Sequence, residues 1–270
     1  PGVRLARHSG LRYGTPALKL SLLLPPAILG IVVLAACTSS SGNREHGTTP
    51  EGPQRKIEGG TIVEPKPGEE KPNEDGKLGT TALSRAKFEN DKLTDVKEIF
   101  EAAAWADTPG HFGARIAFDK NNFLFMSVGD RMAGLRPEGM DPTKLETHPA
   151  QDLSSGQGKI IRLRDDGSVP MDNPFVGQAG KRPEIWSYGH RNPQGLAFNP
   201  DTGVLWETEH GPQGGDELNI IERGKNYGWP VIGYGVNYVV GTEIHKTRYR
   251  DGMEQPKAFN TMLLRFLQAE

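Results

Sequence analysis

The chain has a single cysteine, Cys37, among its 270 residues. One thiol cannot form an internal disulfide, and zinc ribbons and iron–sulfur clusters need several cysteine ligands. The composition therefore excludes a disulfide-stabilised scaffold and a metal centre built from several cysteines.

An excess of charge of one sign is also lacking. The 32 Lys and Arg residues nearly balance the 34 Asp and Glu residues, and the formal net charge is −2. Proteins that bind nucleic acid through its phosphates carry a basic surface, so no nucleic-acid partner is expected. The sequence also lacks a Gly-x-Ser-x-Gly elbow, a Walker loop and a dinucleotide fingerprint, so hydride chemistry here would need another kind of cofactor.

Turn-forming residues are abundant. The chain has 34 glycines and 21 prolines, well above their usual shares of about 7% and about 5%. Hydrophobic residues make up 35%, and they cluster in the second half of the chain. This composition favours short strands joined by turns over a bundle of long helices.

The first 37 residues have the features of an export signal. Basic residues come first: Arg4, Arg7, Arg12 and Lys19. The apolar run Leu20–Ala36 follows, and small residues end it directly before Cys37, as in a secretory signal. This ending resembles the lipobox of bacterial lipoproteins, in which the cysteine is lipidated. Residues 1–37 are therefore predicted to be a signal peptide with a lipobox, which implies a lipid-anchored, periplasm-facing protein of the bacterial cell envelope.

A plain transmembrane anchor is the alternative interpretation of the same apolar run. Leu20–Ala36 is shorter than the ~20 residues that usually span a bilayer. The pair Pro25–Pro26 inside the run also disfavours a helix, because proline removes a backbone donor. The lipoprotein interpretation is therefore favoured.

Two regions follow the leader. Residues 38–79 are rich in Ser, Gly, Pro, Glu and Lys, and such a segment cannot bury enough apolar surface to offset its ordering entropy. We predict a flexible polar linker there and a globular, all-β domain over residues 80–270. The last stretch, residues 260–270, has a helix-like pattern unlike the rest.

Two blocks of the globular part share one template. Residues 115–119 form a β-prone run that a Lys-Asn-Asn turn connects to residues 123–128, and residues 195–199 precede a Pro-Asp-Thr-Gly turn and residues 204–208. A partial copy, residues 159–163, lies between them. A spacing of about 40 residues per unit is typical of the four-stranded blades of a β-propeller. A β-sandwich with chance similarity between its hairpins is the alternative.

Two glycine-containing segments could present polar side chains in a cleft. His111 lies between Gly110 and Phe112-Gly113, just before a predicted strand, and a neutral imidazole can act as a general base near pH 7. Arg191 and Asn192 lie in Tyr-Gly-His-Arg-Asn-Pro-Gln-Gly, where a guanidinium and an amide could bind an oxyanion. A histidine bonded to backbone and a surface arginine in a polar turn are the structural alternatives.

A third segment, residues 207–217, combines glycines and a proline with four carboxylates. Ca²⁺ binds carboxylate and backbone carbonyl oxygens in irregular geometry. The spacing does not match an EF-hand, and a solvated acidic loop explains the composition equally well.

Several stretches together resemble one family. Residues 80–256 are similar to the soluble aldose sugar dehydrogenases of the glucose/sorbosone dehydrogenase family. The resemblance rests on these stretches: Thr81–Arg85, Asp95–Glu101, His111–Phe118, Ser127–Arg131, Gly158–Leu163, Tyr188–Gly195, Glu209–Pro212, Gly215–Glu217 and Lys225–Pro230. The resemblance implies a six-bladed β-propeller that uses pyrroloquinoline quinone and Ca²⁺ to oxidise aldose sugars to lactones.

The resemblance also implies roles for single residues. His111 matches the general base that takes the proton from the anomeric hydroxyl of the sugar, while hydride passes to the quinone. Arg191 and Asn192 match residues that contact the quinone oxygens, and Arg191 would also stabilise developing negative charge. Arg131 lies where the family places a polar contact to the cofactor.

The metal ligands follow in the same way. Gly211 and Pro212 match the backbone carbonyls that hold the cofactor's Ca²⁺, and Asp216 resembles a carboxylate beside this site. The ion would act as a Lewis acid on the quinone carbonyl.

The chain departs from the family at both ends. The family has a first blade upstream of the Thr81–Arg85 segment and later blades that bind the cofactor's carboxylates, and neither has a match here. The chain is therefore expected to hold the middle of the propeller, and a non-catalytic propeller that binds sugar or protein in the envelope is the alternative function. The preferred sugar and the electron acceptor, a cytochrome or a quinone-type carrier, are not identified by the sequence.

Overall fold

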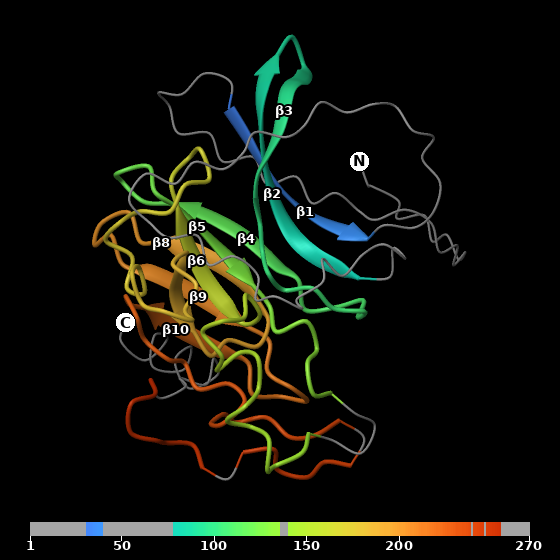
Figure 1. The fold of residues 1–270 in the computed structure, drawn as a ribbon. Helices are drawn as coiled ribbons and strands as arrows, with labels where there is room; N and C mark the ends of the chain where they lie inside the picture. The colour runs from blue at the N-terminus through green and yellow to red at the C-terminus, as the bar shows by residue number, and fades with distance from the viewer. Residues whose placement is uncertain (1–30, 40–77, 136–139, 239, 246, 255–270) are drawn as a thin grey trace, which may run out of the picture.

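The computed structural model describes residues 31–39, 78–135, 140–238, 240–245 and 247–254. In these ranges the chain forms ten strands in three antiparallel sheets and no helix (Figure 1). None of the described segments is therefore a helix long and apolar enough to cross a membrane. The helix-like stretch at residues 260–270 lies outside the described residues.

The central sheet has four strands in sequential order. They are β4 (Gly113–Phe118), β5 (Leu124–Val128), β6 (Lys159–Leu163) and β7 (Ile185–Tyr188). A tight turn joins β4 to β5, and the Asp119 carboxylate accepts two backbone N–H groups within it, at 2.8 and 2.9 Å. This meander of four antiparallel strands is one complete propeller blade.

The third sheet repeats the first hairpin of the central sheet. It contains β8 (Pro193–Phe198), β9 (Leu205–Glu209) and β10 (Glu217–Ile221). Its first turn is built like the one after β4, because the Asn199 side chain accepts two backbone N–H groups at 2.9 and 3.0 Å. The two hairpins predicted from the shared template are therefore confirmed.

The predicted period of about 40 residues is wrong for this part of the chain. Residues 159–163 do not begin a separate unit but form β6, the third strand of the central sheet. The interval between the two matching hairpins contains the long segment 129–158 and the other two strands of the central sheet, β6 and β7. The element that repeats is the two-strand hairpin that begins each sheet, and the apparent partial copy is an inner strand of one sheet.

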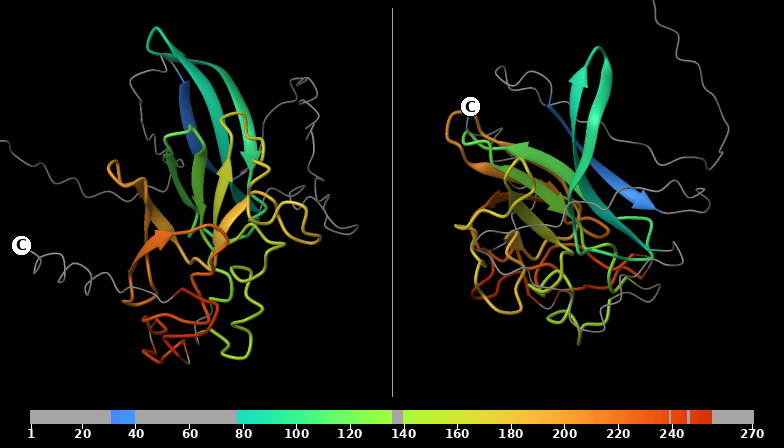
Figure 2. Two further views of the ribbon diagram at one scale, coloured as in Figure 1. Left: turned by 90° about the vertical axis from the view of Figure 1, so that its left-hand side faces the viewer. Right: turned by 45° about the horizontal axis from the view of Figure 1, so that its top comes forward.

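The remaining sheet is formed by β1 (Ile31–Ser39), β2 (Gly79–Glu89) and β3 (Lys92–Glu101). The first strands of the three sheets are neighbours, since β1 contacts β4 and β4 contacts β8 (Figures 1 and 2). Sheets that meet through their first strands are arranged as blades around an axis. The expectation of a partial β-propeller is confirmed.

Strand β1 falls within the predicted leader and the start of the linker. It pairs with β2 along its whole length, from Ile31 opposite Lys87 to Ser39 opposite Gly79. Its first four residues, Ile-Val-Val-Leu, have high β-propensity, and the edge of β2 offers unpaired backbone groups. Residues 1–30 and 40–77 lie outside the described residues, so the signal peptide, the lipobox and the linker stay predictions.

Apolar side chains cover both faces of the central sheet. One cluster packs it against the β1–β3 sheet and includes Leu83, Phe100, Met126 and Leu163. A second packs it against the β8–β10 sheet and includes Phe125, Ile160 and Leu196. Neighbouring residues of β5 face opposite clusters, and all five are buried, as expected for a strand covered on both sides.

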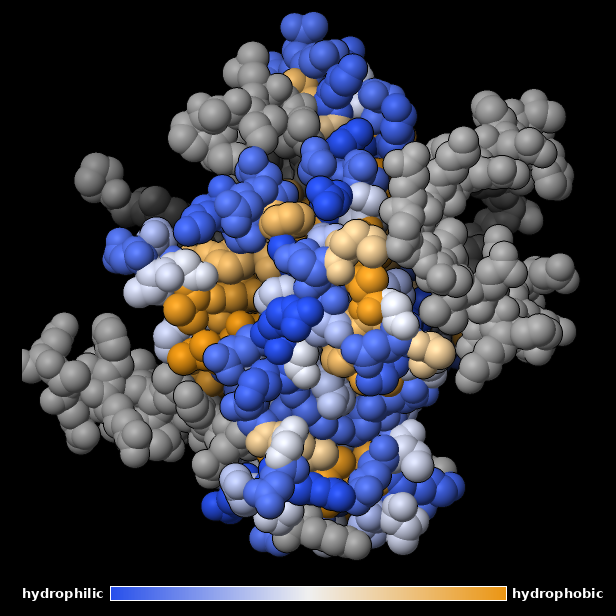
Figure 3. All heavy atoms as spheres, turned by 60° about the vertical axis from the view of Figure 1, so that its left-hand side comes forward, coloured by the Kyte–Doolittle hydropathy of each residue, from blue (hydrophilic) through white to orange (hydrophobic). Residues whose placement is uncertain are grey.

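The long connections gather beyond one end of the sheets. The described parts of the two connections, residues 129–135 and 140–158 and residues 228–238, 240–245 and 247–254, lie together there (Figure 1). A third apolar cluster, which includes Leu145, Trp229 and Ile232, joins them. Hydrophobic residues also remain on the outer surface among hydrophilic ones (Figure 3).

Lys159 at the start of β6 is buried in this region, with 0% of its surface exposed. Its ammonium donates hydrogen bonds to the carbonyls of Pro149, Ala150 and Gln157 at 3.0, 3.1 and 2.5 Å. Burial disfavours the charged form and lowers the pKa of Lys159 from 10.5 to about 7. The lysine therefore ties the segment before β6 to the sheet at an electrostatic cost.

This burial predicts a pH dependence of stability. Between pH 7 and pH 10.5 the unfolded chain binds more protons at Lys159 than the folded chain, so the free energy of unfolding should rise with pH across this window. Replacing the ammonium in Lys159→Met should flatten that rise. Urea unfolding of both proteins at several pH values checks this, and an unchanged slope in the variant would contradict it.

Candidate functional site

Four predicted site residues and Asp130, which was not predicted, lie at the ends of the first two strands of neighbouring sheets. His111 precedes β4 and Asp130 follows β5, while Arg191 and Asn192 precede β8 and Gly211 follows β9. In an antiparallel hairpin the start of the first strand and the end of the second lie at the same edge. Two equivalent hairpins therefore bring all five residues to one end of the molecule.

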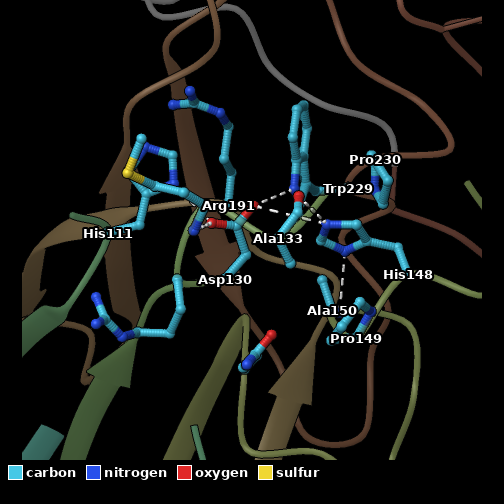
Figure 4. Close-up of polar contacts among 12 residues, drawn as sticks. His111, Asp130, Ala133, His148, Pro149, Ala150, Arg191, Trp229 and Pro230 are labelled. Atoms are coloured by element: carbon cyan, nitrogen blue, oxygen red, sulfur yellow. Dashed lines mark hydrogen bonds and ion pairs between the residues drawn. The ribbon is translucent and has the colours of Figure 1, made fainter. Parts of the chain in front are cut away.

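Asp130 holds the His111 ring. The Nδ1 atom of His111 lies 2.6 Å from Oδ1 of Asp130, whose side chain is only 2% exposed (Figure 4). The other carboxylate oxygen accepts a hydrogen bond of 2.8 Å from Nε1 of Trp229, and the backbone N–H of Met132 donates to Oδ1 at 2.9 Å. With a carboxylate on Nδ1, the neutral ring carries its hydrogen there and leaves Nε2 with a free lone pair, as a general base requires.

The backbone around this pair is constrained. His111, Arg131 and Met132 have positive φ angles of 52°, 56° and 57°, a conformation that is uncommon for residues with a side chain and concentrates at functional sites. Gly129 lies against the same segment, and a Cβ at that position would be 2.0 Å from the carbonyl oxygen of His111. The position of His111 thus depends on the absence of a side chain at Gly129.

Arg191 lies next to both Asp130 and Trp229, and its backbone carbonyl accepts the N–H of Asp130 at 2.7 Å. Its guanidinium carbon is 5.3 Å from the centre of a Trp229 ring, and its NH1 group donates hydrogen bonds of 2.8 Å to the carbonyls of His210 and Gly211. Trp229 therefore contacts both Asp130 and Arg191 (Figure 4). Through this indole the histidine and the arginine belong to one arrangement.

A small, partly open hollow lies beside Arg191, with a volume of about 10 Å³, room for a single water molecule. Aromatic and carboxylate side chains line it together with the backbone of the loop after β9. The lining residues that matter here are Arg191, Glu209, Gly211, Pro212, Glu217, Trp229, Tyr234 and His245. A cation, aromatic walls and convergent polar groups are typical of small-molecule sites.

The structure brings most of the predicted site residues together. Gly211 and Pro212 line the hollow with Arg191, and Asn192 is buried next to it, with a side-chain oxygen that has no hydrogen-bond partner. The Asp216 carboxylate accepts the N–H of Gly211 at 2.9 Å, which shapes the loop. His111 joins them through Asp130 and Trp229 rather than by lining the hollow.

Arg131 occupies a different environment. Its guanidinium donates to the carbonyls of Gly79, Thr108 and Gly110 and lies 3.5 Å from the centre of the Phe112 ring. With 0% of its surface exposed, Arg131 supports the segment that carries His111. Its predicted contact with a cofactor stays a prediction.

Sequence reasoning missed Asp130 and Trp229. Both lie in stretches that carried the family resemblance, but neither has a local pattern that marks it as functional. They are 99 residues apart and meet only in the folded chain.

A buried acidic group was also missed. Glu207, Glu209 and Glu217 are all nearly inaccessible, and the Asn219 amide donates to each of them at 3.1, 3.3 and 3.4 Å. Burial, and then the charge of Glu209, raises the pKa of Glu207 and of Glu217 well above the ordinary range. The acidic segment predicted as a solvated loop or a Ca²⁺ site is thus partly an internal cluster.

The donors around the hollow fit the predicted cofactors in kind. A quinone with carboxylates needs cationic donors, which Arg191 provides, while the unpaired atom of Asn192 is its side-chain oxygen, a hydrogen-bond acceptor. Ca²⁺ prefers carbonyl and carboxylate oxygens, and Gly211, Pro212, Glu209 and Glu217 offer them. Although Arg191 already binds the Gly211 carbonyl, that oxygen has a second lone pair.

The sequence model of one family, described as glucose/sorbosone dehydrogenase, matches residues 69–264. This range covers well over half of the chain and contains every residue of the site described above. The chain belongs to the glucose/sorbosone dehydrogenase family. The resemblance inferred from the sequence is thereby confirmed, and membership assigns the chain to a family of oxidoreductases.

Individual relatives agree with this assignment. Aldose sugar dehydrogenase YliI of Escherichia coli is 46% identical over 167 residues, which are 61% of this chain and 41% of that protein. Quinoprotein glucose dehydrogenase B of Acinetobacter calcoaceticus is 34% identical over 183 residues, 65% of this chain and 36% of that protein. A glucose dehydrogenase crystal structure, 46% identical, superimposes with a TM-score of 0.60 over 68% of this chain and 50% of its own. The chain thus spans about two fifths of the length of these curated relatives.

The contact between Gly129 and His111 can be tested with a methyl group. Gly129→Ala would place its Cβ against the His111 carbonyl, and overpacking of this kind costs about 1–3 kcal/mol. Gly110→Ala is the matched control, because its Cβ would meet only the flexible Met132 side chain, at 2.7 Å from the sulfur. Urea unfolding should show a clear loss of stability for the first variant and a smaller one for the second; equal losses would contradict the argument.

Proposed function

We propose that this chain carries the base and the quinone-binding loops of an aldose sugar dehydrogenase that oxidises sugars to lactones. The observation that carries the proposal is the His111–Asp130 pair, joined through Trp229 to Arg191 and the hollow. The printed names of the relatives, an aldose sugar dehydrogenase and a quinoprotein, support the same reaction and cofactor class.

His111 is the proposed base. Asp130 keeps the hydrogen on Nδ1, so Nε2 can take the proton from the anomeric hydroxyl of the sugar, and the carboxylate stabilises the imidazolium that results. The ring needs no reorientation, because Asp130 itself is fixed by Trp229 and by the Met132 N–H. Positioned bases of this kind contribute about 10²–10⁴-fold to a rate.

Arg191 and Asn192 are the proposed contacts to the quinone. Contacts with Trp229 and with the carbonyls of residues 210 and 211 hold Arg191 in place before a ligand binds. A positive charge that is already in position lowers the activation barrier, because it does not have to reorient during the reaction. The carbonyls of Gly211 and Pro212 would hold Ca²⁺ with a nearby carboxylate. When bound, pyrroloquinoline quinone would accept the hydride and Ca²⁺ would polarise its carbonyl.

A non-catalytic binding protein is the second candidate. The aromatic and polar groups around the hollow are of the kinds that bind a sugar or a peptide without any reaction. The ordered His111–Asp130–Trp229 contacts favour the enzyme, because simple binding does not require a base with a fixed tautomer.

Reconstitution distinguishes the two candidates. The full chain is incubated with Ca²⁺ and pyrroloquinoline quinone, and reduction of a redox dye by aldoses is followed. We expect dye reduction that falls by about 10²-fold or more in His111→Gln. Reduction that survives this substitution would contradict the base assignment, and quinone binding without any reduction would favour the binding protein.

A matched pair of substitutions tests the role of Asp130. Asp130→Asn removes the negative charge that faces Nδ1 of His111 and should lower kcat with little change in KM. Asp201→Asn, in the exposed turn after β8, should leave both kinetic constants unchanged. Near-ultraviolet circular dichroism confirms that both variants are folded.

We also propose that the protein is exported and lipid-anchored at Cys37 in the bacterial envelope, facing the periplasm, where a cytochrome or a quinone-type carrier would take the electrons. Cleavage before Cys37 would leave only Cys37–Ser39 of β1 paired with β2 in the mature protein. The basic residues and apolar run of the leader support this. Labelled fatty acid should be incorporated in cells and should be lost in Cys37→Ser, while the Cys37-lipidated protein fractionates with membranes. Unlabelled wild-type protein would contradict the anchor.

A further inference from the structure

Three buried glutamates in the β8–β10 sheet, Glu207, Glu209 and Glu217, share one hydrogen-bond donor, the neutral amide of Asn219. The register places Glu209 opposite Glu217 and Glu207 opposite Asn219, and all four side chains are buried. Asn219 has two amide hydrogens for three carboxylates. Carboxylates that face each other in a dry site repel one another unless a positive charge lies between them.

His190 completes this group without donating to it. Its ring is fully buried, stacked on Tyr227 at 4.8 Å between centres, and its Nε2 lies 2.9 Å from the hydroxyl of Ser187. The other nitrogen, Nδ1, points to Glu209 but is 3.6 Å from its nearest oxygen. Nδ1 of His190 and Oε1 of Glu207 have no hydrogen-bond partner, although both are buried where unpaired polar atoms are rare.

We propose that His190, Glu207 and Glu209 bind a divalent transition-metal cation of the Zn²⁺ or Mn²⁺ class. One ligand atom from each residue lies within 4.8 Å of the other two, and all three side chains are buried. Three ligands at about 2.1 Å around one ion lie about 3.4–3.6 Å apart. Nδ1 of His190 and the nearer oxygen of Glu209 are already 3.6 Å apart, and a pair at the 4.8 Å limit must approach by about 1 Å. The ion would satisfy both orphaned atoms and compensate the facing carboxylates.

The ligand types select the ion. Imidazole nitrogen combined with carboxylate oxygen suits Zn²⁺ or Mn²⁺, whereas Ca²⁺ and Mg²⁺ prefer oxygen alone. The hydrogen bond between Nε2 and Ser187 would fix the ring so that Nδ1 is the ligating nitrogen, a usual arrangement for metal-bound histidine. His190 and Glu207 distinguish this site from the Ca²⁺ site proposed at the Gly211 and Pro212 carbonyls, and Glu209 lies between the two.

The ion would also have a route of entry and a structural effect. Glu209 lines the hollow as well as the buried group, so the carboxylate connects the site to solvent. Its second oxygen accepts the backbone N–H of Arg191 at 2.5 Å. A metal on Glu209 would thus hold the end of β9 against the start of β8, where the guanidinium projects toward the hollow.

Metal binding can be measured without quinone or sugar, so failure here is separate from failure of the proposed reaction. Untagged full-length chain is stripped with a chelator, supplied with excess Ca²⁺, and titrated with Zn²⁺ by calorimetry. We expect one equivalent to bind and to raise the melting temperature. Glu207→Gln should weaken this binding by about 10-fold or more, while His210→Gln, which removes an exposed imidazole beside Asp216, should keep it.

Glu207→Gln is expected to fold, because it removes a buried charge and keeps the amide contact with Asn219. Circular dichroism checks this, and a Co²⁺ absorption spectrum that changes in His190→Gln gives a second measurement of the ligand set. Absence of stoichiometric Zn²⁺ binding would overturn the proposal and leave a shared proton as the compensating charge. Binding that persists in Glu207→Gln but disappears in His210→Gln would place the metal on the surface and overturn it as well.

Discussion

The carboxylate of Asp130 connects three segments that are far apart in the sequence. It binds the His111 ring at the start of β4, the indole of Trp229 in the last long connection, and the backbone of Met132. The guanidinium of Arg191 contacts the same indole. Because one carboxylate fixes both the tautomer of His111 and the position of Trp229, the relation between the base and the hollow depends on it.

The stacked sheets make this arrangement possible. The central sheet is apolar on both faces, and each face packs against one neighbouring sheet. Such packing holds the hairpins at a fixed distance, so residues at equivalent hairpin ends are neighbours. The β8–β10 sheet is the exception, because its inward positions include Glu207, Glu209 and Asn219. The backbone N–H of Arg191 donates to Glu209 in this polar interior. A cation buried there would therefore help to position Arg191.

Prediction from the sequence succeeded where the signal was local. The two hairpins, their Asp119 and Asn199 turns, and the loops that carry His111 and Arg191 all follow from strand patterns and turn residues. The 40-residue period failed because residues 129–158 separate β5 from β6 and because residues 159–163 complete a sheet instead of starting one. Strands that pair across a long connection, such as β5 and β6, leave no pattern in the sequence near either strand.

The sequence alone determined the family, the β-rich composition, the absence of cysteine chemistry beyond Cys37, and the candidate residues His111, Arg191, Asn192, Gly211 and Pro212. Only the tertiary structure decided that Asp130 and Trp229 join them, that Arg131 is internal, and that three glutamates and a histidine share one buried space. The physical reason is that turns and strand patterns depend on neighbours in the chain, whereas hydrogen bonds and charge compensation depend on groups that meet only after the sheets have packed.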